Sequence, residues 1–204
     1  MPTLVMDQHV EQRIRAERAA SGADRFDETW KGLYVMNPMP NDEHQQLVNR
    51  LASIFQDIID WPGKGHVRPG VNVSDRRDNW QANYRVPDVA VFLNGGSATN
   101  CGEFWFGGPD FAVEIVSPAD RTHDKLAFYA GVGVRELLVV NRRPWNLELF
   151  RLRDRGLVLV GNSLPENEAV LTSQVLPFAF RLQPDTPRPR VVVTQVPTER
   201  VWRV

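Results

Sequence analysis

Two short runs of sequence, PDVAVF (Pro87 to Phe92) and FAVEIVSP (Phe111 to Pro118), carry the clearest structural pattern in this chain. Both runs are apolar and rich in β-branched residues, which is typical of buried strands. Each also contains one carboxylate, Asp88 in the first run and Glu114 in the second. A carboxylate inside a buried strand is costly unless a partner or a cation compensates its charge. The two runs therefore predict a functional site within a sheet.

The spacing of the two carboxylates predicts that they lie side by side. Side chains alternate along a strand, so Asp88 and Glu114 each occupy the face of the even-numbered residues in strands over Val86–Phe92 and Asp110–Ser117. If these strands are antiparallel neighbours, folding the chain about Cys101 pairs the two carboxylates, because each stands thirteen residues from that midpoint. A bulge or an asymmetric loop would shift this register.

Two facing carboxylates repel each other, and burying both requires a shared proton or a cation. Mg²⁺ or Mn²⁺ is favoured because both ions prefer oxygen ligands and the sequence has no cluster of Cys and His. A second positive charge comes from the following helix, which Asp120 or Thr122 can cap and which ends near Gly131. Lys125 on this helix can reach over the C-terminal end of the strand that carries Glu114.

The remaining chain predicts further helices and strands. A helix from Asn41 or Asp42 to about Asp60 has apolar residues at intervals of three and four. His44 lies in its first turn, where a half-buried or capping role is the alternative to a ligand role. Glu28 precedes a short strand and is either a solvated turn carboxylate or a functional one. A solvated helix over His9–Ala20 is expected to lie on the domain or on a partner. Strands are expected over Leu33–Met36, His66–Val73, Glu136–Asn141, Leu147–Leu152 and Gly156–Gly161.

Composition indicates an ordinary globular protein of 204 residues, 42% hydrophobic and 24% charged. The formal net charge of −1 argues against coating of nucleic acid by bulk electrostatics but allows a local basic surface. Candidate phosphate-contacting residues, which are alternatively solvated charges, are Arg76, Arg77, Arg142 and Arg143. The single cysteine favours a reducing compartment. Without a signal-like start or a run of about 18 apolar residues, the sequence predicts a cytoplasmic protein with no membrane contact.

These elements predict an α/β (α+β) fold with one main domain. We expect an N-terminal helical extension over residues 1–23, the main domain over 24–183 and a Pro- and Arg-rich C-terminal arm over 184–204. The last segment, which includes TPRPR, is interpreted as an extended tail or a strand-swapping arm. Such an arm favours a homodimer, and a two-fold dimer would present two sites to a duplex.

Four positions in order resemble the site pattern of the PD-(D/E)XK nuclease superfamily: Pro87, Asp88, Glu114 and Lys125. In the usual pattern the lysine stands two residues after the second acid, a position that Val116 holds here. The order PDVAVF, VEIVSP, D…K…Y…GV and ELLVV is similar to the Uma-two family, the branch in which the lysine has moved to the following helix. Members of this family are mostly assigned as nucleases by fold and site pattern.

The resemblance covers roughly Asp24 to Leu182. It implies a restriction-endonuclease-like core, in which a central mixed sheet is flanked by helices and carries extra antiparallel strands. It also implies a metal-dependent DNA endonuclease. One or two Mg²⁺ (or Mn²⁺) ions would be held by Asp88, Glu114 and the backbone carbonyl of Ile115, and Lys125 would orient the attacking water or offset the growing negative charge. Two residues at matching positions of the entry segment would be accessory, Glu28 and His44.

Two other interpretations remain open. Val116 at the usual lysine position and the near-neutral charge are also features expected of a catalytically inactive nuclease fold that serves as a binding or assembly module. Alternatively, Asp88 and Glu114 bond backbone amides or arginines in a purely structural network.

Overall fold

The computed structural model describes residues 3–5, 7–117 and 121–204. Its helices are α1 (Gln8–Ser21), α2 (Asp42–Phe55) with a following π-helical turn (Gln56–Asp60), and α3 (Leu126–Gly131) with a preceding 3₁₀ turn (Thr122–Lys125); another 3₁₀ turn spans Trp80–Ala82. Asp120, one of the two expected caps of the helix after the second run, lies outside the described residues. Within the described ranges, no helix is long and apolar enough to span a membrane.

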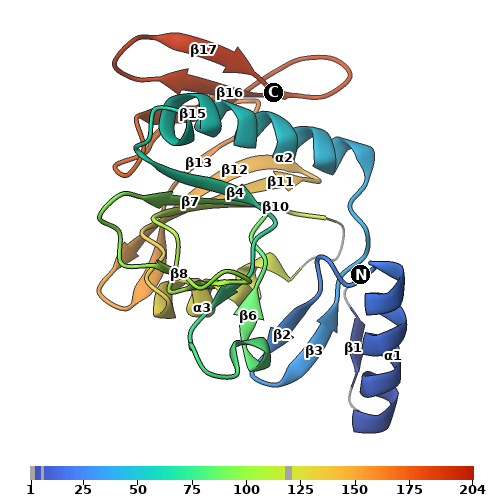
Figure 1. Ribbon diagram of the computed structural model, residues 1–204. Helices are drawn as coiled ribbons and strands as arrows, with labels where there is room; N and C mark the ends of the chain where they lie inside the picture. The colour runs from blue at the N-terminus through green and yellow to red at the C-terminus, as the bar shows by residue number, and fades with distance from the viewer. Residues whose placement is uncertain (1–2, 6, 118–120) are drawn as a thin grey trace.

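A mixed six-stranded sheet forms the centre of the molecule, in the order β13-β12-β11-β10-β7-β4 (Figure 1). Its strands are β4 (Gly65–Pro69), β7 (Val89–Leu93), β10 (Phe111–Ile115), β11 (Glu136–Arg142), β12 (Trp145–Arg153) and β13 (Gly156–Ser163). Strand β10 pairs in parallel with β11 and antiparallel with β7. The predicted α/β (α+β) fold with a central mixed sheet is therefore confirmed.

The register between β7 and β10 is the one predicted by folding the chain about Cys101. The paired residues are Phe111 with Val91, Ala112 with Ala90, and Val113 with Val89. One further step would set Asp88 opposite Glu114, but β7 begins at Val89 rather than at Val86. The ladder ends there because the N–H of Ile115 donates to the Asp88 side chain, and Pro87 has no N–H to offer.

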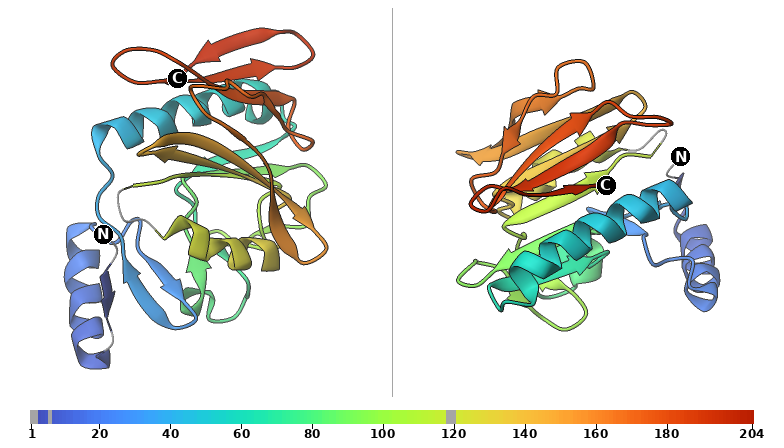
Figure 2. Two further views of the ribbon diagram at one scale, coloured as in Figure 1. Left: turned by 180° about the vertical axis from the view of Figure 1, so that it is seen from behind. Right: turned by 90° about the horizontal axis from the view of Figure 1, so that it is seen from above.

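Two layers cover opposite faces of the central sheet (Figure 2). Helix α2 and the C-terminal strands pack on one face, where a continuous core includes Leu51, Phe55, Phe111 and Phe180. Helix α3 packs on the other face, where the core centres on Tyr129. Burial of each large apolar side chain contributes about 1.5–3 kcal/mol, so these layers fix the sheet that carries the two carboxylates.

The C-terminal segment is not an extended arm. It forms the end of a four-stranded antiparallel sheet of β14 (Leu171–Thr172), β15 (Phe178–Gln183), β16 (Arg190–Gln195) and β17 (Arg200–Arg203). Alternation in RVVVTQ turns Val191 and Val193 inward, and both are buried in the main core with Val204. The prolines are confined to the connections, so the composition that suggests a tail describes only the loops. The expectation of a homodimer was based on an extended arm, and this segment instead packs on its own chain.

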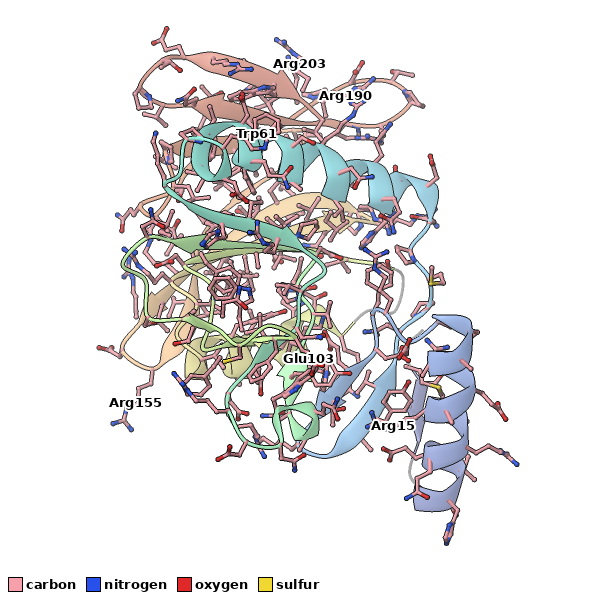
Figure 3. All side chains as sticks on the ribbon, viewed as in Figure 1. Arg15, Trp61, Glu103, Arg155, Arg190 and Arg203 are labelled. Atoms are coloured by element: carbon pink, nitrogen blue, oxygen red, sulfur yellow. The ribbon has the colours of Figure 1, made fainter. Side chains whose placement is uncertain are left out.

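A seven-stranded sheet lies on the α3 side and includes a hairpin formed by β2 and β3 (Figure 1). Its strands are β1 (Thr3–Val5), β2 (Glu28–Trp30), β3 (Leu33–Met36), β5 (Val73–Ser74), β6 (Tyr84–Arg85), β8 (Thr99–Asn100) and β9 (Trp105–Phe106). Helix α1 is largely exposed and is anchored to the hairpin, which agrees with the expectation of a solvated helix lying on the domain. Arg18 donates to buried Asp27 at 2.5 and 2.7 Å, and the Arg15 guanidinium lies 3.8 Å from the Tyr34 ring centre (Figure 3).

Glu136 in β11 ties the central sheet to the C-terminal sheet. This fully buried carboxylate lies 2.7 Å from the Arg151 guanidinium and accepts hydrogen bonds from the Ser173 hydroxyl and the Gln174 N–H. Replacing Glu136 by alanine is expected to lower the free energy of unfolding by about 3–5 kcal/mol, because the arginine loses its counterion. Urea denaturation measures this change. The exposed Glu166→Ala control should shift it by less than about 0.5 kcal/mol, and equal effects would refute the proposed tie.

Candidate functional site

Glu114 lies in the middle of the candidate site, near the end of β10. It is 2% exposed, and its two oxygens lie 3.2 and 3.3 Å from the Lys125 Nζ atom. The Tyr129 hydroxyl also donates to Glu114. Lys125 ends the 3₁₀ turn before α3 and is 5% exposed. The helix-borne lysine predicted from the sequence therefore reaches Glu114, and Tyr129 comes from the same helical run one turn later.

Glu28 belongs to the same cluster and is not a solvated turn carboxylate. It begins β2, is 0% exposed, and lies 2.9 Å from Lys125 Nζ through its Oε1 atom. The Val86 N–H donates to Oε1 at 2.9 Å, and the Trp30 indole N–H donates to Oε2 at 2.6 Å. Lys125 thus joins two buried carboxylates that are 86 residues apart in the sequence. Only the pairing of β2 with β3 and β6 brings Glu28 here.

Asp88 contacts the site from the side of α2. Its Oδ2 atom accepts from the Ile115 N–H at 2.6 Å, and its Oδ1 atom lies 3.2 Å from His44 Nε2. His44 is buried in the first turn of α2, and its Nδ1 atom has no hydrogen-bond partner in the part of the chain that the structure describes. His44 is therefore buried, and the cap of α2 is Asn41, which accepts from the His44 N–H. Asp88 lies against the peptide unit that follows Glu114.

The chemistry of this cluster fits a hard divalent cation. Asp88, Glu114 and Glu28 supply carboxylate oxygens, and the Lys125 ammonium lies 2.9 Å from Glu28 and 3.2 Å from Glu114. The buried Arg85 guanidinium also interacts electrostatically with Glu28 and Glu114. Three carboxylates against these two cations leave a surplus of negative charge, which favours a bound metal ion. Among the described residues, no group of three or more His, Cys, Asp or Glu side chains is arranged to hold a metal. The metal-ligand set that the resemblance implies contains only two such side chains, Asp88 and Glu114, together with the backbone carbonyl of Ile115.

Comparison with known proteins establishes the family. A family model described as "Putative restriction endonuclease" (Uma2) matches residues 28–185. The chain belongs to the Uma2 family. No curated protein matches the sequence. Among solved structures, the chain is similar to a protein of Anabaena variabilis titled a putative nuclease belonging to DUF820, with 15% identity, a TM-score of 0.57, and coverage of 72% of this chain and 80% of that one. This similarity shows a shared nuclease-like fold.

Four arginines were candidates for phosphate contact in this Uma2 family member, and they occupy two kinds of environment. Arg142 is buried and donates to the Val116 carbonyl and to Glu43 at 3.0 Å, so it fixes the start of α2 to the sheet. The other three are exposed on loops: Arg76, Arg77 and Arg143. The exposed three remain candidates, whereas Arg142 would have to break structural contacts to bind phosphate.

Arg85 is a buried cation that sequence analysis does not single out. It donates to the carbonyls of Thr29 and Tyr84, both at 2.8 Å, and has no hydrogen-bond partner for Nε within the described residues. Its guanidinium lies over the rings of Trp30 and Phe128 at 4.5 and 4.3 Å. Burial lowers the pKa of Arg85, and nearby Glu28 opposes that shift. The sequence signal that could have pointed to Arg85 is its position directly before VPD. The sequence alone does not show that the Arg85 side chain turns inward.

The three tyrosines predict that the protein becomes less stable at alkaline pH. Burial is the main cause that raises the pKa of Tyr34, Tyr84 and Tyr129 above the usual value of 10.0; Glu114 raises that of Tyr129 further. The native chain should therefore hold these protons while the unfolded chain loses them, so the free energy of unfolding should fall as pH rises above about 10. Tyrosinate absorbance and urea denaturation measure both effects. Native ionisation near pH 10, as in the urea-unfolded control, would contradict this prediction.

Proposed function

We propose that this protein is a metal-dependent DNA endonuclease that hydrolyses phosphodiester bonds. One observation carries the proposal: Lys125, from the turn before α3, contacts buried Glu114 and Glu28 next to the strand end that holds Asp88. This arrangement has the two acids and the displaced lysine of the nuclease pattern. Membership of the Uma2 family and the nuclease-like fold support the same conclusion. Fold by itself would not, because one fold hosts many functions.

Asp88, Glu114 and the Ile115 carbonyl would hold Mg²⁺ or Mn²⁺ in this proposal. The bound ion would polarise a phosphoryl oxygen and lower the pKa of an attacking water. The chain's own residues would place these oxygens. The Ile115 N–H restrains one oxygen of Asp88, and His44 restrains the other at 3.2 Å. The Tyr129 hydroxyl restrains Glu114.

Lys125 would place a positive charge beside the scissile phosphate. Its ammonium is held by Glu114 on one side and Glu28 on the other, so its position is set before substrate binds. A preorganised donor of this kind stabilises negative charge that grows in the transition state. Glu28 would thus act through Lys125, as a positioning residue. In hydrolysis, water adds to phosphorus, the bond to one sugar oxygen breaks, and that oxygen takes up a proton.

Nicking of supercoiled plasmid tests the proposal directly. The wild-type protein should nick plasmid with added Mg²⁺ or Mn²⁺ and not in excess EDTA. Asp185→Asn is a suitable control, because this exposed carboxylate pairs with Arg190 and, among the described residues, does not contact Lys125 or the carboxylates of the candidate site. That variant should nick at the wild-type rate. Absence of nicking across metals would remove the endonuclease proposal.

A second candidate function is a catalytically inactive nuclease fold that serves as a binding or assembly module. Val116 at the usual lysine position favours it, and so does the compact pairing of Lys125 with both glutamates. Calorimetry with Mn²⁺ separates the two functions. The endonuclease proposal expects Mn²⁺ binding that is lost in Asp88→Asn, whereas the inactive module expects no binding in either protein.

A further inference from the structure

A cavity opens beside the candidate site, on the face of α3 that carries Phe128. Its volume is about 440 Å³, within the range of about 300–1,000 Å³ that is typical of small-molecule sites. Two residues join its wall to the proposed catalytic groups. Trp30 donates its indole N–H to Glu28, and Phe128 lies three residues after Lys125 in the same helical run. A group in this cavity would therefore be close to Lys125.

The aromatic rings of the cavity wall contact two arginines. The buried Arg85 guanidinium lies over both Trp30 and Phe128, at 4.5 and 4.3 Å, and so links the two rings. Arg121 lies over the Trp30 ring at 4.9 Å, and its side chain is 39% exposed. A planar guanidinium at the mouth of a cavity offers a surface on which a flat ring can stack.

The charges of the lining favour a neutral, hydrogen-bonding ring over a phosphate. Arg121 and Lys31 are balanced by Asp124 and Asp75, and the Arg121–Asp124 pair is 2.7 Å apart. A wall whose charges balance offers a phosphate no net electrostatic attraction. The two wall carboxylates can accept hydrogen bonds from the exocyclic amino group of a nucleobase. A base therefore fits this cavity, while its phosphate would lie toward Lys125.

We propose that this cavity receives one unpaired nucleobase next to the cleaved bond, so that the substrate is a DNA strand with an unstacked nucleotide. The inference rests on the proposed endonuclease function and adds the substrate class. A base inside a continuous duplex is covered by its neighbours and its partner, and it cannot enter a cavity without leaving the stack. Single-stranded, bulged or frayed DNA provides such a base at the least cost.

Gly131 allows the cavity to be filled without touching the proposed catalytic residues. It lies in the cavity wall at the end of α3, and a Cβ atom added there meets nothing within 4 Å. Gly131→Leu should therefore fold normally and occupy part of the cavity. Gly156→Leu is a matched control, because Gly156 at the start of β13 has equally open surroundings and does not line the cavity. A urea denaturation curve for each variant checks that it is folded.

The binding test uses a short DNA strand with one 2-aminopurine, whose fluorescence changes when the base leaves its neighbours and enters a different environment. The wild-type protein, without added metal, should bind this strand more tightly than the matching duplex and change its fluorescence. Gly131→Leu should weaken binding about tenfold or more, as expected for loss of one stacked base, and Gly156→Leu should not. Equal affinity of wild type and Gly131→Leu, equal affinity for strand and duplex, or no binding at all overturns the inference. Displacement of the strand by deoxyadenosine monophosphate at similar concentrations would assign the cavity to free nucleotides and also overturn it.

Cleavage separates failure of this inference from failure of the proposed function. A bulged duplex should be cut faster than a continuous one, and Gly131→Leu should lose that advantage. If plasmid nicking depends on Glu114 but Gly131→Leu behaves as wild type in both assays, the inference fails and the endonuclease stands. If no DNA is cut but the binding results hold, the endonuclease fails and the base cavity stands.

Discussion

Replacing Glu114 by glutamine is expected to lower plasmid nicking by about 10²–10³-fold or more, with little change in fold. Glutamine keeps the shape of the side chain and can still accept a hydrogen bond from the Tyr129 hydroxyl. It removes the negative charge that a divalent cation requires, and preorganised groups at such sites have effects of this size. Lys125 keeps one carboxylate partner, Glu28, at 2.9 Å. The nicking rate at saturating Mg²⁺ measures the effect.

Glu148→Gln is the matched control for this prediction. Glu148 lies on β12 in the same cross-sheet row as Glu114, because Val139 of β11 pairs with both residues. Its carboxylate contacts His123 and Asn141 rather than Lys125. Nicking by Glu148→Gln should match the wild type. If Glu114→Gln cuts as fast as the wild type, Glu114 does not take part in the reaction and the proposed site is wrong.

Replacing Lys125 by methionine is expected to abolish nicking and to lower the free energy of unfolding by about 3–5 kcal/mol. Two carboxylates, Glu28 and Glu114, are buried against this lysine, and its removal leaves their charges without that compensation. Methionine keeps most of the length and apolar volume of lysine, so the loss of charge dominates the change. Urea denaturation in EDTA measures stability without a contribution from added metal.

A double variant distinguishes this electrostatic effect from a packing defect. Combining Lys125→Met with Glu28→Gln removes one uncompensated charge. The double variant should therefore be more stable than Lys125→Met alone. The exposed Lys64→Met is the control and should change stability by less than about 0.5 kcal/mol. If Lys125→Met is as stable as the wild type, Lys125 does not hold the two glutamates together.

Two segments can be interpreted only in part from the sequence. From sequence alone, Glu28 is either a solvated turn carboxylate or a functional residue, and residues 184–204 are interpreted as an extended tail or a strand-swapping arm. Glu28 belongs to β2, whose partner β6 is distant in sequence, whereas β16 pairs with the preceding strand β15 across a short Pro-rich connection. The local amino-acid composition predicts the loops well, but it does not show which strand pairs with a given segment. His44 is a similar case, because its partner Asp88 lies on another element.

The amino-acid sequence by itself determined the two central strands, the long amphipathic α2 and the lysine after β10, and it predicted the β7–β10 register on the condition that these strands are antiparallel neighbours. Each of these follows from local alternation, helical spacing or loop symmetry, which are properties of short windows of chain. Only the tertiary structure decided that Glu28 shares Lys125 with Glu114, that Arg85 and Trp30 line the approach to them, and that the C-terminal strands close the core. These contacts join residues far apart in sequence, and they form because burying a charge or an apolar face requires a partner that only the complete fold supplies.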